Sequence, residues 1–421
     1  MLQAIYILTV IIALFIALRK RNISFVFVYF LSSVLYYFNA LEGEVFVGKL
    51  SRIGVESYGM SAGTYVVLLI NLLLIIFMLM SEHIVEYNKK TPQSGEGRVI
   101  KIFIILVLIF SVYMAFKYNL LFRTSYNKAE LAEEGGSIQT YFKYLATFSF
   151  VLAYVQEGNK LSTPLKIAAI IPLIVTFLFG NRSFLVIGVI AVVFDKVYKS
   201  CKEKNVPLHS DLSRHKKLVI GLTVFTLVVL IIKGVTGALF IGDMDLVMSR
   251  LSNPEYYKQV FYVSEPNTIM GNLDAIVSHN YQVTRSSYRT LWAYLIPLVT
   301  GSINQAFGFE NFTYSYQREL FGTSNRASTY LGEAFANGGY LIVLVVAGLA
   351  IITMVLIFKG YNKCNSNISK TMLLLIGIDI AFYMQRNSMS FQFSRIRDYL
   401  YIGIILYFIV GIMDRNHKVR L

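Results

Sequence analysis

The chain has 421 residues, of which 56% are hydrophobic and only 15% are charged. A water-soluble core of this size cannot absorb that much apolar surface, so the composition excludes a soluble globular protein and predicts an integral membrane protein. The formal net charge of +15 reflects largely the basic residues that cytoplasmic loops of membrane proteins carry, so we do not expect nucleic acid as a partner.

Continuous apolar runs, rather than alternating ones, predict helices that cross a hydrocarbon core of about 30 Å. We expect an all-α polytopic fold with eleven spans, give or take one. In chain order the predicted spans are Leu2–Leu18, Ile23–Leu41, Ala62–Met80, Val99–Phe116, Ile138–Val155, Ile167–Phe179, Phe184–Tyr198, Leu218–Ile232, Leu331–Phe358, Thr371–Tyr383 and Tyr399–Met413. The apolar run Leu291–Thr300 fits either a re-entrant or interfacial helix or a further span.

The spacing of these runs divides the chain into three parts. Residues 1–232 hold the first eight predicted helices, residues 233–330 form one large external loop, and residues 331–421 hold the last three helices. The loop is the one large soluble element that the sequence predicts.

The orientation follows from the placement of Lys and Arg. One register of alternating sides puts 22 of the 39 basic residues in six short segments, which we assign to the cytoplasm. These segments are Arg19–Asn22, Ser81–Lys101, Gln156–Lys166, Asp195–Lys217, Lys359–Lys370 and Asp414–Leu421. The N-terminus is therefore expected outside and the C-terminus in the cytoplasm. Basic residues follow the first span and none precedes it, the reverse of a cleaved signal peptide, so we expect that helix to be retained.

The two cysteines, Cys201 and Cys364, both fall in predicted cytoplasmic segments. Thiols stay reduced in that compartment, so no disulfide is expected.

Basic residues on the outer side are the informative ones, because the positive-inside rule disfavours cations there. They include Arg182 in a short polar hinge, Arg326 near the end of the external loop, and Arg386, Arg395 and Arg397 between the last two spans. A guanidinium at the membrane surface can bind a phosphate or pyrophosphate through two parallel hydrogen bonds. We therefore predict an anion-binding role for these arginines.

Structural ion pairs are the alternative for the same arginines. Each would snorkel to lipid phosphates or pair with a carboxylate, and Asp398 is the obvious neighbour for Arg395. Asp379 is the clearest ionisable residue within a span, and Arg386 follows it by seven residues on the same helical face. That pair is expected to be structural, with a functional role as the alternative.

The external loop offers few other candidates. Its aromatic residues fit either a sugar-stacking groove or an interfacial belt. His279, the only histidine predicted to lie outside, is a candidate general base and otherwise a structural residue. Asp243 and Asp245 could hold a metal, but no cluster of His, Cys and carboxylates occurs at ligand spacing, so we expect no metal site and no cofactor.

One stretch carries a family resemblance. "TSNRASTYLGEAFANGGYLIVLVVAG" (Thr323–Gly348), where a large external loop re-enters the membrane, resembles the Wzy-type O-antigen polymerases and related oligosaccharide repeat-unit polymerases. The hinge "GNRSFLV" (Gly180–Val186) resembles the arginine-bearing turn of that family. The similarity in architecture covers essentially the whole chain.

The resemblance implies a helical glycosyltransferase of GT-C-like arrangement in the bacterial inner (cytoplasmic) membrane. Such an enzyme polymerises undecaprenyl-pyrophosphate-linked repeat units into O-antigen or a related surface polysaccharide. The implied partners are this lipid-linked oligosaccharide, membrane lipid and a chain-length regulator protein. Catalytic roles carry over to Arg182 and Arg326, and to Glu333 in "YLGEAF".

The related O-antigen ligases tend to have a histidine where this chain has Ala327, which leaves His279 and Glu333 as alternative bases. A polysaccharide transporter or flippase and an O-antigen ligase are the competing functions, and a non-catalytic membrane scaffold is a further one.

Overall fold

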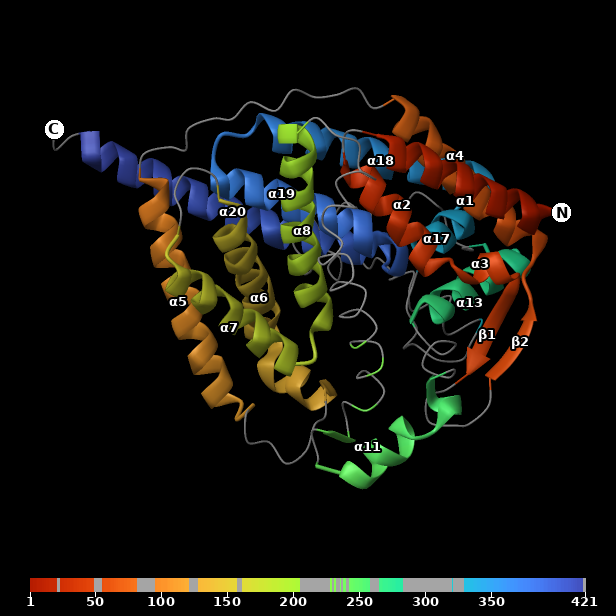
Figure 1. Ribbon diagram of the computed structural model, residues 1–421, viewed down its shortest axis with the longest axis horizontal. Helices are drawn as coiled ribbons and strands as arrows, with labels where there is room; N and C mark the ends of the chain where they lie inside the picture. Colours follow the sequence, from red (N-terminus) through yellow and green to blue (C-terminus); the bar gives the residue numbers. More distant parts are fainter. Residues whose placement is uncertain are drawn as a thin grey trace. The chain divides into compact units, whose positions relative to one another are not determined.

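The computed structural model describes residues 1–20, 23–48, 55–81, 95–120, 128–156, 161–204, 242–257, 265–282 and 329–418, Leu320, and five single positions between 228 and 239. In these residues the chain is helical apart from one two-stranded sheet (Figure 1). The predicted helical, polytopic class is confirmed at this level. The count of eleven spans stays a prediction, and the predicted runs Leu218–Ile232 and Leu291–Thr300 lie almost wholly outside the described residues.

Most of the helices occupy the predicted apolar runs. The helices of twelve residues or more are α1 (Leu2–Arg19), α2 (Phe25–Tyr36), α4 (Ala62–Ser81), α5 (Glu96–Lys117), α6 (Lys128–Val155), α7 (Thr163–Leu178), α8 (Arg182–Lys204), α13 (Glu265–Ser278), α18 (Gly339–Lys363), α19 (Asn367–Tyr383) and α20 (Met389–Lys418). The shorter ones are α3 (Asn39–Glu42), α11 (Met244–Leu251), α17 (Tyr330–Ala336) and the 3-10 helix η2 (Met384–Arg386).

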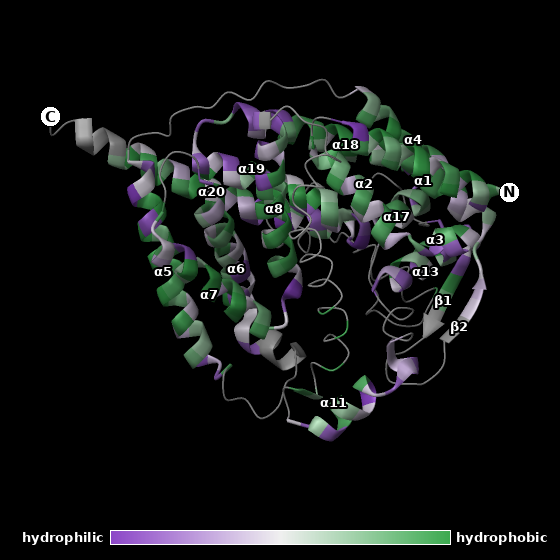
Figure 2. Ribbon diagram, in the orientation of Figure 1, coloured by the Kyte–Doolittle hydropathy of each residue, from purple (hydrophilic) through white to green (hydrophobic). Residues whose placement is uncertain are grey.

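Six helical segments of the described chain are long and apolar enough to cross a membrane. They are α1, α4, α5, α18, the segment Asn367–Arg386 that joins α19 to η2, and Phe391–Met413 within α20. Figure 2 shows hydrophobic residues along most of α1, α4 and α5. The helices α2 and α7 are apolar but shorter.

The ninth predicted span, Leu331–Phe358, is wrong in its outer part. The chain breaks after α17 at Gly338 and Gly339, whose φ angles are +154° and +66°, and α18 begins only at Gly339. Such backbone angles are open to glycine and rare for other residues, so the two glycines end the helix. As a result, Glu333 lies on a separate buried helix and not on the long helix α18.

The chain forms two compact units. Unit 1 comprises Met1–His83, Asn205–Val355 and Ile380–Ser394, and unit 2 comprises Ile84–Lys204, Leu356–Asp379 and Arg395–Leu421. The predicted three-part division describes membrane topology, and it stays a prediction.

Unit 1 contains a hairpin that the sequence analysis did not predict. Strands β1 (Glu44–Gly48) and β2 (Val55–Gly59) pair antiparallel, with Val45 opposite Tyr58. Helix α13 packs against β1 and also against α2, α4 and α17 (Figure 1). The segment predicted as an external loop therefore contributes a buried helix to the core of this unit.

Unit 2 is built on α5, α6, α7 and α8, which pack against one another (Figure 1). Part of its core is an aromatic and aliphatic cluster at the end of α7, which includes Met114, Phe142 and Phe179. At the opposite end of α5, the buried Glu96 carboxylate accepts hydrogen bonds from Ser366 Oγ at 2.7 Å and from the Ile368 N–H at 2.9 Å. These bonds tie the start of α19 to α5.

The predicted orientation leads to a labelling experiment. A cysteine at Ser183 should react with an impermeant thiol reagent in intact cells, because Ser183 is half-buried in the predicted external turn. Native Cys364, also half-buried, should react only after the membrane is permeabilised. Cys201 should be replaced in both proteins, since its complete burial would keep it silent on either side. Labelling of Cys364 in intact cells would reverse the orientation.

Candidate functional site

The hinge that carries Arg182 is a tight turn between α7 and α8. Gly180 has a φ of +78°, and its N–H donates to the Phe177 carbonyl at 2.8 Å. Phe179 is fully buried in the core cluster, so the turn is anchored from one side. Arg182 is the first residue of α8 and half-buried, with its guanidinium carbon 6.0 Å from the centroid of the Phe177 ring. The fold therefore fixes the position of this arginine closely.

Arg395 forms a buried ion pair with Asp379. Its Nε lies 2.7 Å from Asp379 Oδ2, and its Nη2 lies 2.6 Å from Oδ1. Only 1% of Arg395 and none of Asp379 is exposed. This two-point geometry offsets the large cost of taking both charges out of water. The pair ties α20 to α19 within unit 2.

Two aromatic rings lie beneath this arginine. The guanidinium carbon of Arg395 is 4.4 Å from the centroid of the Phe184 ring and 5.9 Å from that of Tyr144. The Lys143 ammonium is 5.2 Å from the same Phe184 centroid. Cations are attracted to the faces of aromatic rings, so Phe184 brings together charges from α6 and α20. Arg182 precedes Phe184 by two residues on α8, so its backbone lies beside this region although its side chain leaves the helix on a different face.

Arg397 completes this group. Its Nε donates to Asp398 Oδ1 at 2.9 Å, and its side chain keeps 15% of its surface exposed. We call Lys143, Arg182, Arg395 and Arg397 the cation cluster. Two carboxylates, Asp379 and Asp398, lie among these cations. Cations gathered beside low-dielectric aromatic groups form a positive field that attracts anions.

Both predicted ion pairs differ from those in the structure. Asp379 pairs with Arg395 and not with Arg386, and Asp398 pairs with Arg397 and not with Arg395. The expected spacing of seven residues assumed one continuous helix, but α19 ends at Tyr383 and the chain continues as η2. Sequence periodicity fails at such a break.

Arg386 lies in unit 1. It forms an ion pair with Glu265, the first residue of α13, and its Nη1 donates to the Tyr383 hydroxyl. Its guanidinium carbon is 4.5 Å from the centroid of the Tyr383 ring. Both ion-paired side chains remain 27% exposed. Arg386 therefore links η2 to α13, and we interpret it as a structural residue of unit 1.

Glu333 is held on α17 by hydrogen bonds at the start of that helix. The Tyr330 hydroxyl bonds to Asn71 Oδ1 at 3.1 Å and to the Tyr29 hydroxyl, and Thr329 Oγ1 lies 3.1 Å from the Tyr37 hydroxyl. All seven residues of α17 are buried. A Cβ at Gly332, just before the glutamate, would lie 2.8 Å from Ile276 Cδ1 of α13, so a larger residue there would require that side chain to shift.

The Glu333 carboxyl reaches the first turn of α20. Its Oε2 accepts a hydrogen bond from the Met389 N–H at 2.7 Å, beside the N-cap Ser388 whose Oγ accepts from the Phe391 N–H at 3.2 Å. Oε1 is buried without a hydrogen-bond partner among the described residues. Burial raises the pKa of Glu333 to about 8, and the bond from Met389 offsets only part of this effect. Glu333 is therefore mostly protonated at neutral pH.

This pKa predicts a pH dependence of stability. The ordinary pKa of the carboxyl is 4.5, so the unfolded chain loses this proton at a pH where the folded chain still holds it. The free energy of unfolding should then fall by on the order of 1 kcal/mol per pH unit between the two values as pH rises. In Glu333→Gln this pH-dependent component should be absent, because an amide does not titrate in this range. The variant is a fair control, since the amide oxygen can still accept from the Met389 N–H. Thermal unfolding in detergent from pH 5 to 9 measures it, and parallel curves for the two proteins would contradict the raised pKa.

The remaining candidates from the sequence belong to unit 1 or lie outside the described residues. His279 is exposed, and its Nδ1 lies 2.9 Å from the Ala275 carbonyl at the end of its own helix. Asp243 is the N-cap of α11 and accepts from the Leu246 N–H at 3.0 Å, so its carboxylate is used in structure. Within the described ranges, no group of three or more His, Cys, Asp or Glu could hold a metal ion. Arg326 lies outside the described residues.

Sequence analysis missed Lys143. It is the sixth residue of the predicted span Ile138–Val155, and a lysine within an apolar span is itself a signal of function. The aromatic residues Tyr144 and Phe184 carried no such signal. Their role depends on α6, α8 and α20 meeting in space.

Comparisons with protein-family models, with curated proteins and with solved structures give no match to this chain.

Proposed function

We propose that this protein is a membrane glycosyltransferase that polymerises lipid-pyrophosphate-linked oligosaccharide repeat units, as in the Wzy-type family that the sequence resembles. The observation that carries the proposal is the cation cluster. Its four cations come from three helices, and three of them, Arg182, Arg395 and Arg397, lie in segments that the charge bias assigns to the outer side. Lipid-linked repeat units are polymerised on that side in the family.

The reaction requires a positively charged environment. The bond between the anomeric carbon of the growing chain and its pyrophosphate oxygen breaks, and an acceptor hydroxyl forms the new glycosidic bond. Negative charge builds up on the departing lipid pyrophosphate, and fixed donors that meet this charge lower the barrier. The acceptor's proton goes to a base. Of the two candidates from the sequence, Glu333 is mostly protonated at neutral pH, so His279 is the base in this proposal.

The four cations have different roles in this proposal. Arg182, Arg397 and Lys143 are half-buried, so they can reach both the protein and a ligand. Arg395 directs Nε and Nη2 at Asp379, which makes it a positioning residue that holds α20 and adds charge nearby. This revises the expectation from the sequence that Arg395 itself binds pyrophosphate.

The proposal is tested by the glycans of a deletion strain. Loss of a polymerase should leave single repeat units on the surface and a pool of lipid-linked repeats on the outer leaflet. Loss of all repeat units from the outer leaflet would instead indicate a flippase. Polymer that is still made but stays on the lipid carrier would indicate a ligase.

The sequence has no cluster of His, Cys and carboxylates at the spacing of metal ligands, and this gives a further prediction. Purified protein should polymerise a lipid-linked repeat unit equally well with and without EDTA, because fixed cations supply the electrophilic role. Activity that disappears in EDTA and returns with magnesium or manganese would contradict this expectation. Asp245 and Asp243 would then become the candidate metal ligands. Asp243 would first have to release its hydrogen bond from the Leu246 N–H.

A further inference from the structure

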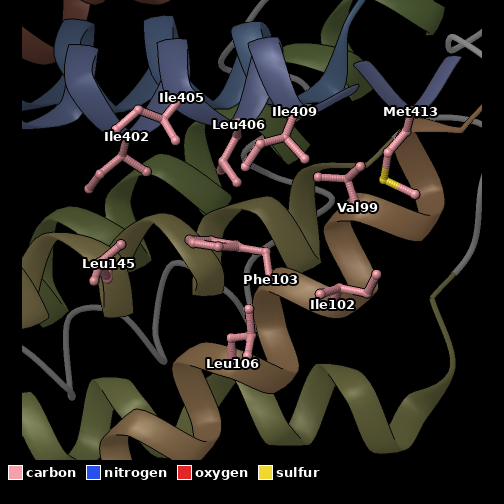
Figure 3. A pocket seen from close by; sticks show the side chains of 10 residues that line it. All are labelled: Val99, Ile102, Phe103, Leu106, Leu145, Ile402, Ile405, Leu406, Ile409 and Met413. Atoms are coloured by element: carbon pink, nitrogen blue, oxygen red, sulfur yellow. The ribbon is translucent and has the colours of Figure 1, made fainter. Parts of the chain in front are cut away.

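The interiors of the two units differ in chemistry. In unit 2, a groove between α5, α6 and α20 is lined only by apolar side chains, among them Phe103, Leu145 and Ile402 (Figure 3). In unit 1, polar side chains from several helices are buried together and bond to one another. Polar groups buried among apolar helices of a membrane protein are rare and commonly functional. We therefore looked for a site in the polar interior of unit 1.

Helix α2 directs its polar side chains inward. Tyr29, Ser33 and Tyr37 recur every four residues, which places them on one helical face. All three are buried, whereas Leu31 and Leu35 are 45% and 43% exposed. This is the reverse of the pattern of a helix on the surface of a soluble protein. The polar face of α2 therefore packs against the rest of unit 1.

A network of neutral groups extends from this face. The Tyr29 hydroxyl donates to Asn71 Oδ1 of α4 at 2.8 Å, and the Tyr330 hydroxyl of α17 donates to the same oxygen at 3.1 Å. Asn71 Nδ2 and Gln385 Nε2 both lie within hydrogen-bond distance of Ser33 Oγ, at 3.5 Å and 2.6 Å. The network thus joins α2, α4, α17 and η2 without a charged side chain.

Glu333 is the carboxylic acid next to this network. It follows Tyr330 by one turn of α17, its Oε2 accepts from the Met389 N–H, and its Oε1 is buried without a hydrogen-bond partner. The start of α20 favours a carboxylate, whereas burial favours the neutral acid. The pKa of about 8 means that burial outweighs the helix end at neutral pH. Loss of the proton would therefore leave a buried negative charge with no donor at Oε1.

No charged side chain of the described residues compensates this carboxyl. Helix α17 packs against α13 and η2. On these elements Glu265 and Arg386 pair with each other, and Asp274 accepts from two hydroxyls at the start of α4. His279, just after α13, is exposed and bonded to the carbonyl of its own helix. The first turn of α20 has no charged residue, and the tyrosine hydroxyls are neutral in this pH range.

We propose that Glu333 is a proton-binding site that controls the contact between α17 and the first turn of α20. In the closed state the carboxyl group holds its proton and stays buried against Met389. When its O–H bond breaks, the proton passes to water and the carboxylate is more stable in a hydrated position, so the contact opens. The site lies within unit 1 and does not depend on which reaction the protein catalyses.

Hydrogen exchange of the full-length protein in phosphatidylglycerol and phosphatidylethanolamine vesicles tests this as a function of pH. The amides of Met389–Gln392 report the opening, and each exchange rate divided by the chemical rate of a free amide at the same pH gives the opening constant. Opened Glu333 has its ordinary pKa of 4.5, whereas the closed form holds its proton up to a pKa of about 8. The opening constant should therefore rise about tenfold per pH unit between about pH 5 and 8, and stay level above pH 8.

Two variants provide matched controls. Glu333→Gln keeps the shape of the side chain and cannot lose a proton, so its opening constant should stay within about twofold over the same pH range. Asp274→Asn changes the other buried acid near α17 and should keep the wild-type profile at Met389–Gln392. The amides of Val67–Leu72 in α4 serve as an internal reference, because a local opening leaves them protected in all three proteins.

Infrared difference spectra between low and high pH detect the proton itself, since only a protonated carboxyl group has the C=O stretching band of a carboxylic acid. The wild type should lose one such band with a midpoint near pH 8, and Glu333→Gln should lack this band.

Four results would overturn the proposal. The same rise at Val67–Leu72 would mean that the protein unfolds as a whole. A rise that persists in Glu333→Gln would assign the effect to another group. Absence of the infrared band in the wild type at neutral pH would show that Glu333 is ionised. Loss of the band with a level opening constant would show that the proton leaves without moving α17.

Discussion

Asp379→Asn should destabilise the protein by about 3–5 kcal/mol, the usual consequence of breaking a buried ion pair from one side. The substitution keeps the shape of the side chain but leaves the Arg395 charge fully buried without its carboxylate. Arg395→Met should have an effect of similar size, because the Asp379 charge then loses its partner. Thermal unfolding in detergent, together with the amount of protein in the membrane, measures the loss.

The double variant Asp379→Leu with Arg395→Met distinguishes the cost of one unpaired buried charge from a requirement for the ion pair itself. It removes both charges, so its stability should return to near the wild-type value. Asp398→Asn is a second control, since its partner Arg397 is partly exposed and should lose less. Two single variants that unfold at the wild-type temperature would show that the Asp379 and Arg395 charges are not buried together.

Arg182→Lys should lower polymer formation nearly as much as Arg182→Ala, by about a hundredfold in rate. A lysine keeps the charge but loses the planar guanidinium that binds two phosphate oxygens at once. Loss of a charged contact that strengthens in the transition state costs on the order of 3 kcal/mol, which corresponds to this rate effect. The readout is the ratio of polymer to single repeat units at equal amounts of membrane protein.

Arg19 provides the matched control. Its guanidinium carbon lies 4.0 Å from the centroid of the Phe15 ring at the end of α1, in unit 1, so it too is an arginine over an aromatic ring. Arg19→Lys and Arg19→Ala should leave polymer formation at the wild-type level. If Arg182→Lys makes polymer at the wild-type rate, Arg182 only anchors the turn in the headgroup region, and Arg397 and Lys143 become the main anion-binding candidates.

The sequence by itself determined the class of the protein and the position of most of its helices. Continuous apolar runs cannot stay in water, and a helix is the structure that satisfies the backbone of one such run inside a membrane. Helices α1, α4 and α5 therefore begin and end at the predicted residue or within three residues of it. The arginine hinge was also visible, because a short polar break between two apolar runs is a local feature.

Only the tertiary structure decided which charges meet. Asp379 and Arg395 are sixteen residues apart, and their pairing depends on the break after Tyr383 that turns α20 back along α19. Lys143, Tyr144 and Phe184 come together because α6, α8 and α20 pack within one unit. Glu333 owes its raised pKa to burial among α2, α13 and η2. Periodicity reports the faces of one helix, whereas contacts between helices depend on packing that no single segment encodes.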